Sequence, residues 1–319
     1  MTETVDVVII GGGPAGLSAG LNLVRANRSV LIVDSNRPRH SATLQSHGFL
    51  TRDGASPLEL RRLGREEFEA YPTARFAQAK VTEVTAEPGQ PADADPLGFR
   101  VRAAGIRGGA NVDVRASRVL IAAGLTEELP PLPLMRAFYG TALHSCVECD
   151  GFEKSEKPLA LIGETTDVFA RALLISRFSS DLIVFTNGAD TVRPEQEAQL
   201  ASLGIRVERR EIVDLVGERA EMTGVQLADG TVIERVGGFV RPRWHAPVEF
   251  LADAEIERDD WGLLVVSERG ETSVRGIYAV GDIVPPGPQQ LIIAAGGGAR
   301  VAARINLDLI RAALPEESA

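Results

Sequence analysis

The sequence predicts an α/β protein with two nucleotide-binding, Rossmann-like three-layer domains. The main observation is a pattern of strand, glycine turn, helix and strand that occurs twice along the 319 residues. In the first copy the strands are Val5–Ile10 and Val30–Val33, and in the second they are Leu159–Ile162 and Leu182–Phe185. Alternation of apolar strands with helices is typical of parallel sheets covered by helices, and the length suffices for two domains.

The first copy carries a dinucleotide-binding turn. Gly11, Gly13 and Gly16 follow the first strand and open the helix Leu17–Arg25. Such glycines permit a tight turn, close approach of a pyrophosphate, and close packing of helix on strand. Asp34 ends the second strand, 18 residues after Gly16, where an acid can hold ribose hydroxyls.

The second copy has Gly163 in its turn and Val168–Ser176 as its helix. A proline-rich segment, Thr126–Pro133, precedes this copy, and Trp244–Val248 follows it. Both segments read as linkers that enclose an inserted domain. Further on, Gly276–Asp282 predicts a strand that ends in Gly-Asp, and a helix is predicted within Gln289–Leu309.

The two cysteines predict redox chemistry. Cys146 and Cys149 are the only cysteines, and Asp150 follows the second at once. Two thiols at this spacing can close a small, reducible disulfide. A zinc site needs about four ligands, and the histidines (His40, His47, His144 and His245) form no second ligand pair, so no metal is expected.

The charge balance excludes several partners. The net charge is −10, from 34 basic and 44 acidic residues, which argues against nucleic acid or an anionic membrane as a partner. No apolar run approaches the roughly 20 residues that cross a bilayer. The first residues enter a strand without a charged leader, so a cytoplasmic location is expected.

Taken together, these motifs resemble the low-molecular-weight thioredoxin reductases and their relatives over nearly the whole chain. The resemblance implies bound FAD, a homodimer, and an FAD domain (residues 1–126 and 246–319) split by an inserted nicotinamide-type domain (residues 127–245). The residues expected to hold the cofactor include the glycine turn and Asp34. The full set that the resemblance implies is Gly11, Gly13, Pro14, Ala15, Gly16, Asp34, Ser35, His47, Ala123, Gly124, Gly281, Asp282, Gln289, Gln290 and Leu291.

The same resemblance implies roles at the disulfide. Cys149 is expected beside the flavin, and Cys146 is expected to exchange with the substrate. Asp150 or a nearby histidine would accept the substrate proton, with His144 as the leading histidine; His40 and His47 remain candidates to line the site.

The inserted domain departs from the reductases. Thr165 stands where the family has its second glycine, Val168 replaces a small residue, and Glu164 and Asp167 add negative charge where a diphosphate would lie. Thr186-Asn187-Gly188 offers no cation for a 2′-phosphate, so NADPH is expected to fit poorly.

Relatives without these elements include the gliotoxin- and holomycin-type dithiol oxidases, which use oxygen. The segments Arg37–Gly54 and Val240–Trp244 resemble that branch, whereas Asp150 stands where those oxidases tend to have histidine. We therefore predict oxidation of a small dithiol with oxygen as acceptor and peroxide as product. The alternative is a reductase of a thioredoxin-like protein that takes electrons from ferredoxin, another flavin or NADPH.

A non-enzymatic sensor would be expected to lose the cysteine pair or the FAD elements. Arg241 and Arg243 are expected to be a solvated charge pair.

Overall fold

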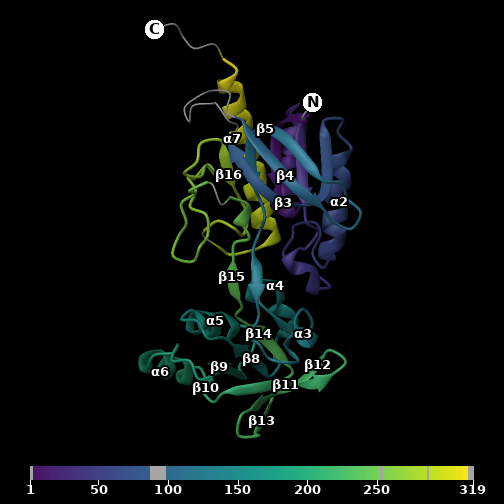
Figure 1. Ribbon diagram of the computed structural model, residues 1–319. Coiled ribbons are helices and arrows are strands. Elements are labelled where there is room, and N and C mark those ends of the chain that lie inside the picture. Colours follow the sequence, from purple (N-terminus) through teal and green to yellow (C-terminus); the bar gives the residue numbers. More distant parts are fainter. Residues whose placement is uncertain (1–2, 87–97, 252–253, 286, 315–319) are drawn as a thin grey trace. The chain divides into compact units, whose positions relative to one another are not determined.

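The computed structural model describes residues 3–86, 98–251, 254–285 and 287–314 (Figure 1). Contacts divide the chain into two units. Unit 1 contains Met1–Arg39, Leu58–Thr126 and His245–Ala319, and unit 2 contains His40–Pro57 and Glu127–Trp244. The sequence predicts residues 40–57 in the first domain, whereas their contacts group them with unit 2.

Unit 1 contains a mixed sheet covered on both faces. Its strands are β1 (Glu3–Ile10), β2 (Val30–Asp34), β3 (Ala74–Ala86), β4 (Phe99–Gly105), β5 (Val112–Ile121) and β16 (Ile277–Ala279). Its helices are α1 (Pro14–Arg25), α2 (Pro57–Glu69) and α7 (Leu291–Ala312), with the 3-10 turns η1 (Arg39–Ala42), assigned in part to unit 2, and η3 (Glu249–Leu251). Strands β2, β1, β5 and β16 run parallel, and β3, β4 and β5 form an antiparallel meander.

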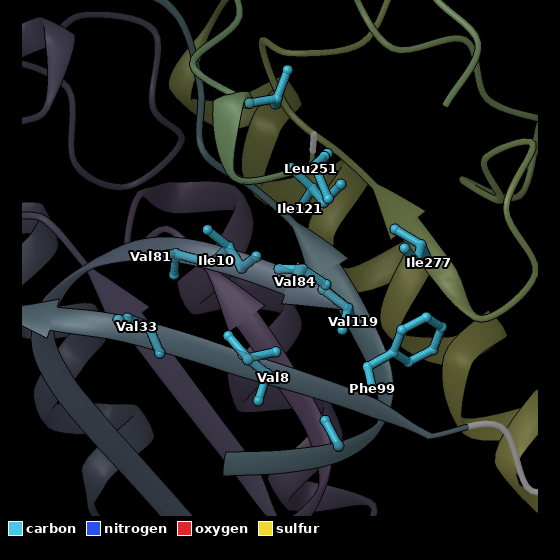
Figure 2. Close-up of a cluster of buried hydrophobic side chains, with 14 of the residues drawn as sticks. Val8, Ile10, Val33, Val81, Val84, Phe99, Val119, Ile121, Leu251 and Ile277 are labelled. Atoms are coloured by element: carbon cyan, nitrogen blue, oxygen red, sulfur yellow. The ribbon is translucent and has the colours of Figure 1, made fainter. Parts of the chain in front are cut away.

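The second half of strand β1, Val7–Ile10, is buried on both faces, which explains its unbroken apolar sequence. Val7 and Ile9 pack with α1 and α7 in one hydrophobic cluster. Val8 and Ile10 pack against Val84 and other residues of the meander in a second cluster (Figure 2). This three-layer packing fixes the end of β1, where the glycine turn begins.

Unit 2 contains a five-stranded parallel sheet in the order β10-β9-β8-β14-β7. These strands are β7 (Leu143–His144), β8 (Leu159–Ile162), β9 (Leu182–Phe185), β10 (Arg206–Glu208) and β14 (Gly237–Val240). The helices are α3 (Met135–Phe138), α4 (Val147–Asp150), η2 (Phe152–Lys154), α5 (Val168–Ile175) and α6 (Pro194–Ser202). The antiparallel meander β11 (Ile212–Glu218), β12 (Glu221–Leu227) and β13 (Val232–Glu234) forms a further sheet, and β6 (Thr126–Glu128) pairs with β15 (Arg243–His245).

The helices of the described ranges include none with both the length and the apolar character that a membrane crossing requires.

Candidate active site

The turn between β1 and α1 leaves room for a ligand at one glycine and none for a side chain at two others. A Cβ on Gly11 would lie 2.3 Å from the Ala122 carbonyl oxygen, and one on Gly16 would lie 1.9 Å from the Gly11 carbonyl oxygen. At Gly13 a Cβ would meet no atom within 4 Å. Helix α1 begins with Pro14 and no side-chain cap, so its first N–H groups can face an anion. These features fit the pyrophosphate of a dinucleotide.

Asp34 lies at the end of β2 and is 8% exposed. Arg61, from α2, donates an Nη2–H to its Oδ2 at 2.6 Å and an Nε–H to the Gly12 carbonyl at 3.3 Å. A carboxylate has acceptor capacity beyond this bond, so Asp34 can still accept ribose hydroxyls. Ser35 follows it and is half-buried. Sequence reasoning missed Arg61, because nothing in its helix distinguishes it from the neighbouring arginines.

We refer to the glycine turn and Asp34 together as the unit 1 cradle. The ends of β5 and β16 bring further predicted residues to this cradle. The parallel register of β1, β5 and β16 places Ala123, Gly124 and Gly281 at the same edge of the sheet as the glycine turn. A Cβ on Gly281 would lie 3.0 Å from the Cβ of Ala15. Next to it, the Asp282 carboxylate accepts a hydrogen bond from Arg39 at 2.6 Å.

The start of α7 completes the predicted set. Gln289 and Gln290 precede the helix, which begins at Leu291 without a side-chain cap. Helix α7 packs closely on α1, since a Cβ on Gly298 would lie 2.2 Å from the Ala15 carbonyl oxygen. The predicted cofactor residues of unit 1 thus lie on or beside one edge of its sheet, and the remaining one, His47, belongs to unit 2.

Cys146 and Cys149 form a disulfide in unit 2. Cys146 is the N-cap of the short helix α4, and its sulfur accepts a hydrogen bond from the Cys149 N–H at 3.2 Å. This N–H would stabilise a thiolate on Cys146 after reduction. On the other side, Arg171 donates to the Ser145 carbonyl at 2.9 Å and so anchors the residue before the disulfide.

Asp150 and His144 meet beside the disulfide. The His144 Nε2 lies 3.4 Å from the Asp150 Oδ1, and both side chains are largely buried. Burial raises the pKa of Asp150 to about 6. Burial, with the Lys154 cation, lowers the pKa of His144 to about 3. Asp150 is therefore the stronger base of the pair at neutral pH, and His144 is an uncharged imidazole.

His47 lies in unit 2, in the 40–57 segment. Its Nε2 is 3.5 Å from Glu153 Oε1, and its Nδ1 is 3.6 Å from Asp53 Oδ1. Both carboxylates belong to the same unit as the disulfide. The structure thus groups His47 with Asp150 and His144 in unit 2, and its predicted role at the cofactor stays a prediction. His40 lies in the turn η1.

The turn after β8 carries acidic side chains that pair with the turn itself and with neighbouring segments. Asp167 accepts hydrogen bonds from Thr165 at 2.6 Å and from Arg171 at 3.2 Å, and it lies 2.8 Å from Arg241. Glu164 accepts a bond from Asn187 at 2.7 Å. Glu164 and Asp167, the two acidic residues that the sequence analysis places in this turn, are therefore both paired with other side chains.

The expectation of a solvated Arg241–Arg243 pair is wrong for Arg241. Its side chain is 19% exposed, lies over the Trp244 ring, and pairs with Asp167. Arg243 is 64% exposed, as expected, and lies 3.6 Å from Glu164. The sequence shows only that two arginines are close together. It does not show that Arg241 pairs with Asp167, which lies 74 residues earlier in the chain.

In the part of the chain that the structure describes, no three His, Cys, Asp or Glu side chains are grouped so as to hold a metal ion.

A family model described as pyridine nucleotide-disulphide oxidoreductase matches residues 5–298. Thioredoxin reductase tcpT of Claviceps purpurea is 29% identical over 295 residues, which cover 88% of this chain and 87% of that protein.

Solved structures of similar fold include thioredoxin reductase-like proteins. A Bacillus anthracis protein named as thioredoxin reductase TrxB has a TM-score of 0.88 and 34% identity, covering 97% of this chain and 100% of its own. The structure of HlmI has a TM-score of 0.89 and 34% identity, covering 98% of this chain and 95% of its own. The predicted fold class and the predicted resemblance to thioredoxin reductases are confirmed.

Proposed function

The chain belongs to the pyridine nucleotide-disulphide oxidoreductase family, and from that premise we propose that it oxidises a small dithiol to a disulfide, with oxygen as acceptor and peroxide as product. It is a disulfide oxidoreductase of the thioredoxin reductase-like kind, whose members bind FAD. The residues that would hold FAD are those of the unit 1 cradle, from the glycine turn to Asp34, Gly281 and Asp282.

One observation supports the entry of electrons through the disulfide rather than from a nicotinamide. In unit 2 the turn that a nicotinamide dinucleotide would need carries Asp167, whose carboxylate pairs with both Arg171 and Arg241. The two arginines that a diphosphate could use here are therefore already paired with a carboxylate, which the phosphates would have to displace or share. Electrons are therefore proposed to enter through the disulfide.

The proposed chemistry uses the residues around Cys146 and Cys149. A substrate thiolate attacks the Cys146 sulfur, the S–S bond breaks, and Cys149 leaves as a thiolate. The second substrate thiol attacks the mixed disulfide and releases Cys146, whose thiolate the Cys149 N–H stabilises. Asp150 accepts the substrate proton, as its pKa of about 6 allows. Bound FAD would take two electrons from the reduced cysteine pair, whose S–S bond closes again, and would pass them with two protons to oxygen. Overall, a dithiol and O₂ yield a disulfide and H₂O₂.

The second candidate is a reductase of a thioredoxin-like protein, driven by ferredoxin or another flavin. Asp150 favours it, because the resemblance associates an acid at this position with the reductases. The same thiol steps would run in reverse. A homodimer and a cytoplasmic location stay predictions.

The test is oxygen uptake by the purified flavoprotein in air with a dithiol such as dithiothreitol. We expect one peroxide for each disulfide formed, measured with an oxygen electrode and confirmed by the return of half the oxygen on adding catalase. Free FAD at equal concentration is the control. If the flavin accepts electrons from a reduced ferredoxin while dithiol yields no peroxide, the reductase is the correct function.

A further inference from the structure

Lys154 is a buried cation next to the disulfide. Its residue is 8% exposed, and no other lysine among the described residues is buried. It ends the 3-10 turn η2, which Gly151 separates from α4, and it lies five residues after Cys149. A buried lysine loses hydration, and it needs hydrogen-bond acceptors and a nearby negative charge to remain an ammonium.

The structure supplies the acceptors. The Lys154 Nζ donates to the Ala142 carbonyl at 2.9 Å and to the Thr141 carbonyl at 3.5 Å. Ala142 is one residue before β7, which carries His144, and its carbonyl also accepts from the Gly238 N–H of β14 at 3.0 Å. Lys154 thus ties the segment after the disulfide to the edge of the sheet before it.

The charge of Lys154 acts on both members of the acid–base pair. It lowers the pKa of Asp150 against the larger effect of burial, and it lowers the pKa of His144 together with burial. The other charged groups that act on Asp150 are His47, which lowers its pKa, and Glu153, which raises it. In return, Asp150 raises the pKa of Lys154, although burial brings it down to about 8.

We propose that Lys154 is a positioning residue for the thiol chemistry: the carbonyls of Thr141 and Ala142 hold its buried ammonium beside the His144–Asp150 pair, where its charge favours the carboxylate form of Asp150. Asp150 is thereby kept in the form that can accept a proton. This inference rests on the proposed function only for the direction of the reaction, since a dithiol reaction in either direction needs the same proton carrier.

The first measurement follows the carboxyl group itself in the oxidised protein, with no substrate present. Aspartate labelled with ¹³C at its carboxyl carbon is titrated by NMR, and the Asp150 signal is identified by its loss in Asp150→Asn. In Lys154→Met, which removes the cation and keeps much of the side-chain volume, the midpoint should rise by on the order of one pH unit. Lys154→Arg keeps the charge and should restore the wild-type midpoint.

Lys157 provides a matched control. It is exposed, lies three residues further on, and donates to the Glu153 carbonyl at 2.9 Å. Lys157→Met removes the same charge from the same segment and should leave the Asp150 midpoint within roughly 0.2 pH units, since an exposed charge is screened by solvent.

A second measurement follows the rate at which dithiothreitol bleaches the flavin without oxygen, from pH 5 to pH 9. The ratio of Lys154→Met to wild type at each pH cancels the titration of the dithiol. This ratio should fall about tenfold between pH 8 and pH 5.5.

An unchanged Asp150 midpoint in a folded Lys154→Met protein, or a rate ratio that is equal at every pH, would overturn the inference. The two proposals can fail separately. If wild-type flavin resists the dithiol while Lys154→Met still moves the carboxyl titration, the oxidase function fails and the role of Lys154 stands.

Discussion

Replacement of either cysteine of the disulfide by serine is expected to stop the dithiol from bleaching the flavin. In Cys146→Ser and in Cys149→Ser no S–S bond remains for a substrate thiolate to attack, so the rate should fall on the order of 10³-fold or more. The measurement is anaerobic stopped-flow absorbance of the flavin after mixing with dithiothreitol. Peroxide formation in air should fall equally.

The control for these variants is the flavin itself. Both proteins should bind FAD as the wild type does, because the cradle residues belong to unit 1 and the cysteines to unit 2. Dithionite should bleach all three proteins alike. A serine variant that retains FAD and is still bleached by the dithiol at the wild-type rate would show that electrons bypass the disulfide.

Asp150→Asn is expected to slow dithiol oxidation about 100-fold near pH 7, since it removes the proposed proton acceptor. The wild-type rate, corrected for the titration of the dithiol, should rise through about pH 6. The carboxylate form is present above the pKa of Asp150 and is lost below it. In Asp150→Asn this rise should disappear. Stopped-flow bleaching from pH 5 to pH 9 measures both effects.

Glu195→Gln offers a matched control for the loss of a carboxylate, because Glu195 is exposed in the first turn of α6. Its rate should stay within about twofold of wild type, as expected for a surface change. His144→Gln separates the two candidate bases. If it removed the pH-dependent rise while Asp150→Asn kept it, the imidazole would be the proton acceptor and the assignment of Asp150 would be wrong.

The elements with a continuous apolar pattern were predictable from the sequence. The strand β8 and the strand β9 have the predicted bounds, Leu159–Ile162 and Leu182–Phe185, because each is an apolar run buried on both faces. The glycine turn and Asp34 were predictable for a related reason, since their spacing between strand and helix reflects a geometry that few other turns need.

The features that set the chemistry of the disulfide were not predictable in the same way. Helix α4 is a single turn, too short for any periodic pattern. Lys154 and Arg241 look like surface residues in sequence, because long charged side chains are rarely buried, and their acceptors come from other segments. The grouping of His47 with the disulfide depends on contacts between residues 40–57 and residues 127–244, which begin 70 residues further along the chain.

The most direct test of the account is anaerobic mixing of the purified flavoprotein with NADPH, with NADH and with dithiothreitol in separate experiments, followed by flavin absorbance. We predict that dithiothreitol bleaches the flavin and that neither nicotinamide does, because Asp167 already pairs with Arg171 and Arg241 at the turn that a dinucleotide would need. Prompt bleaching by NADPH would contradict it and would make the protein a nicotinamide-dependent reductase.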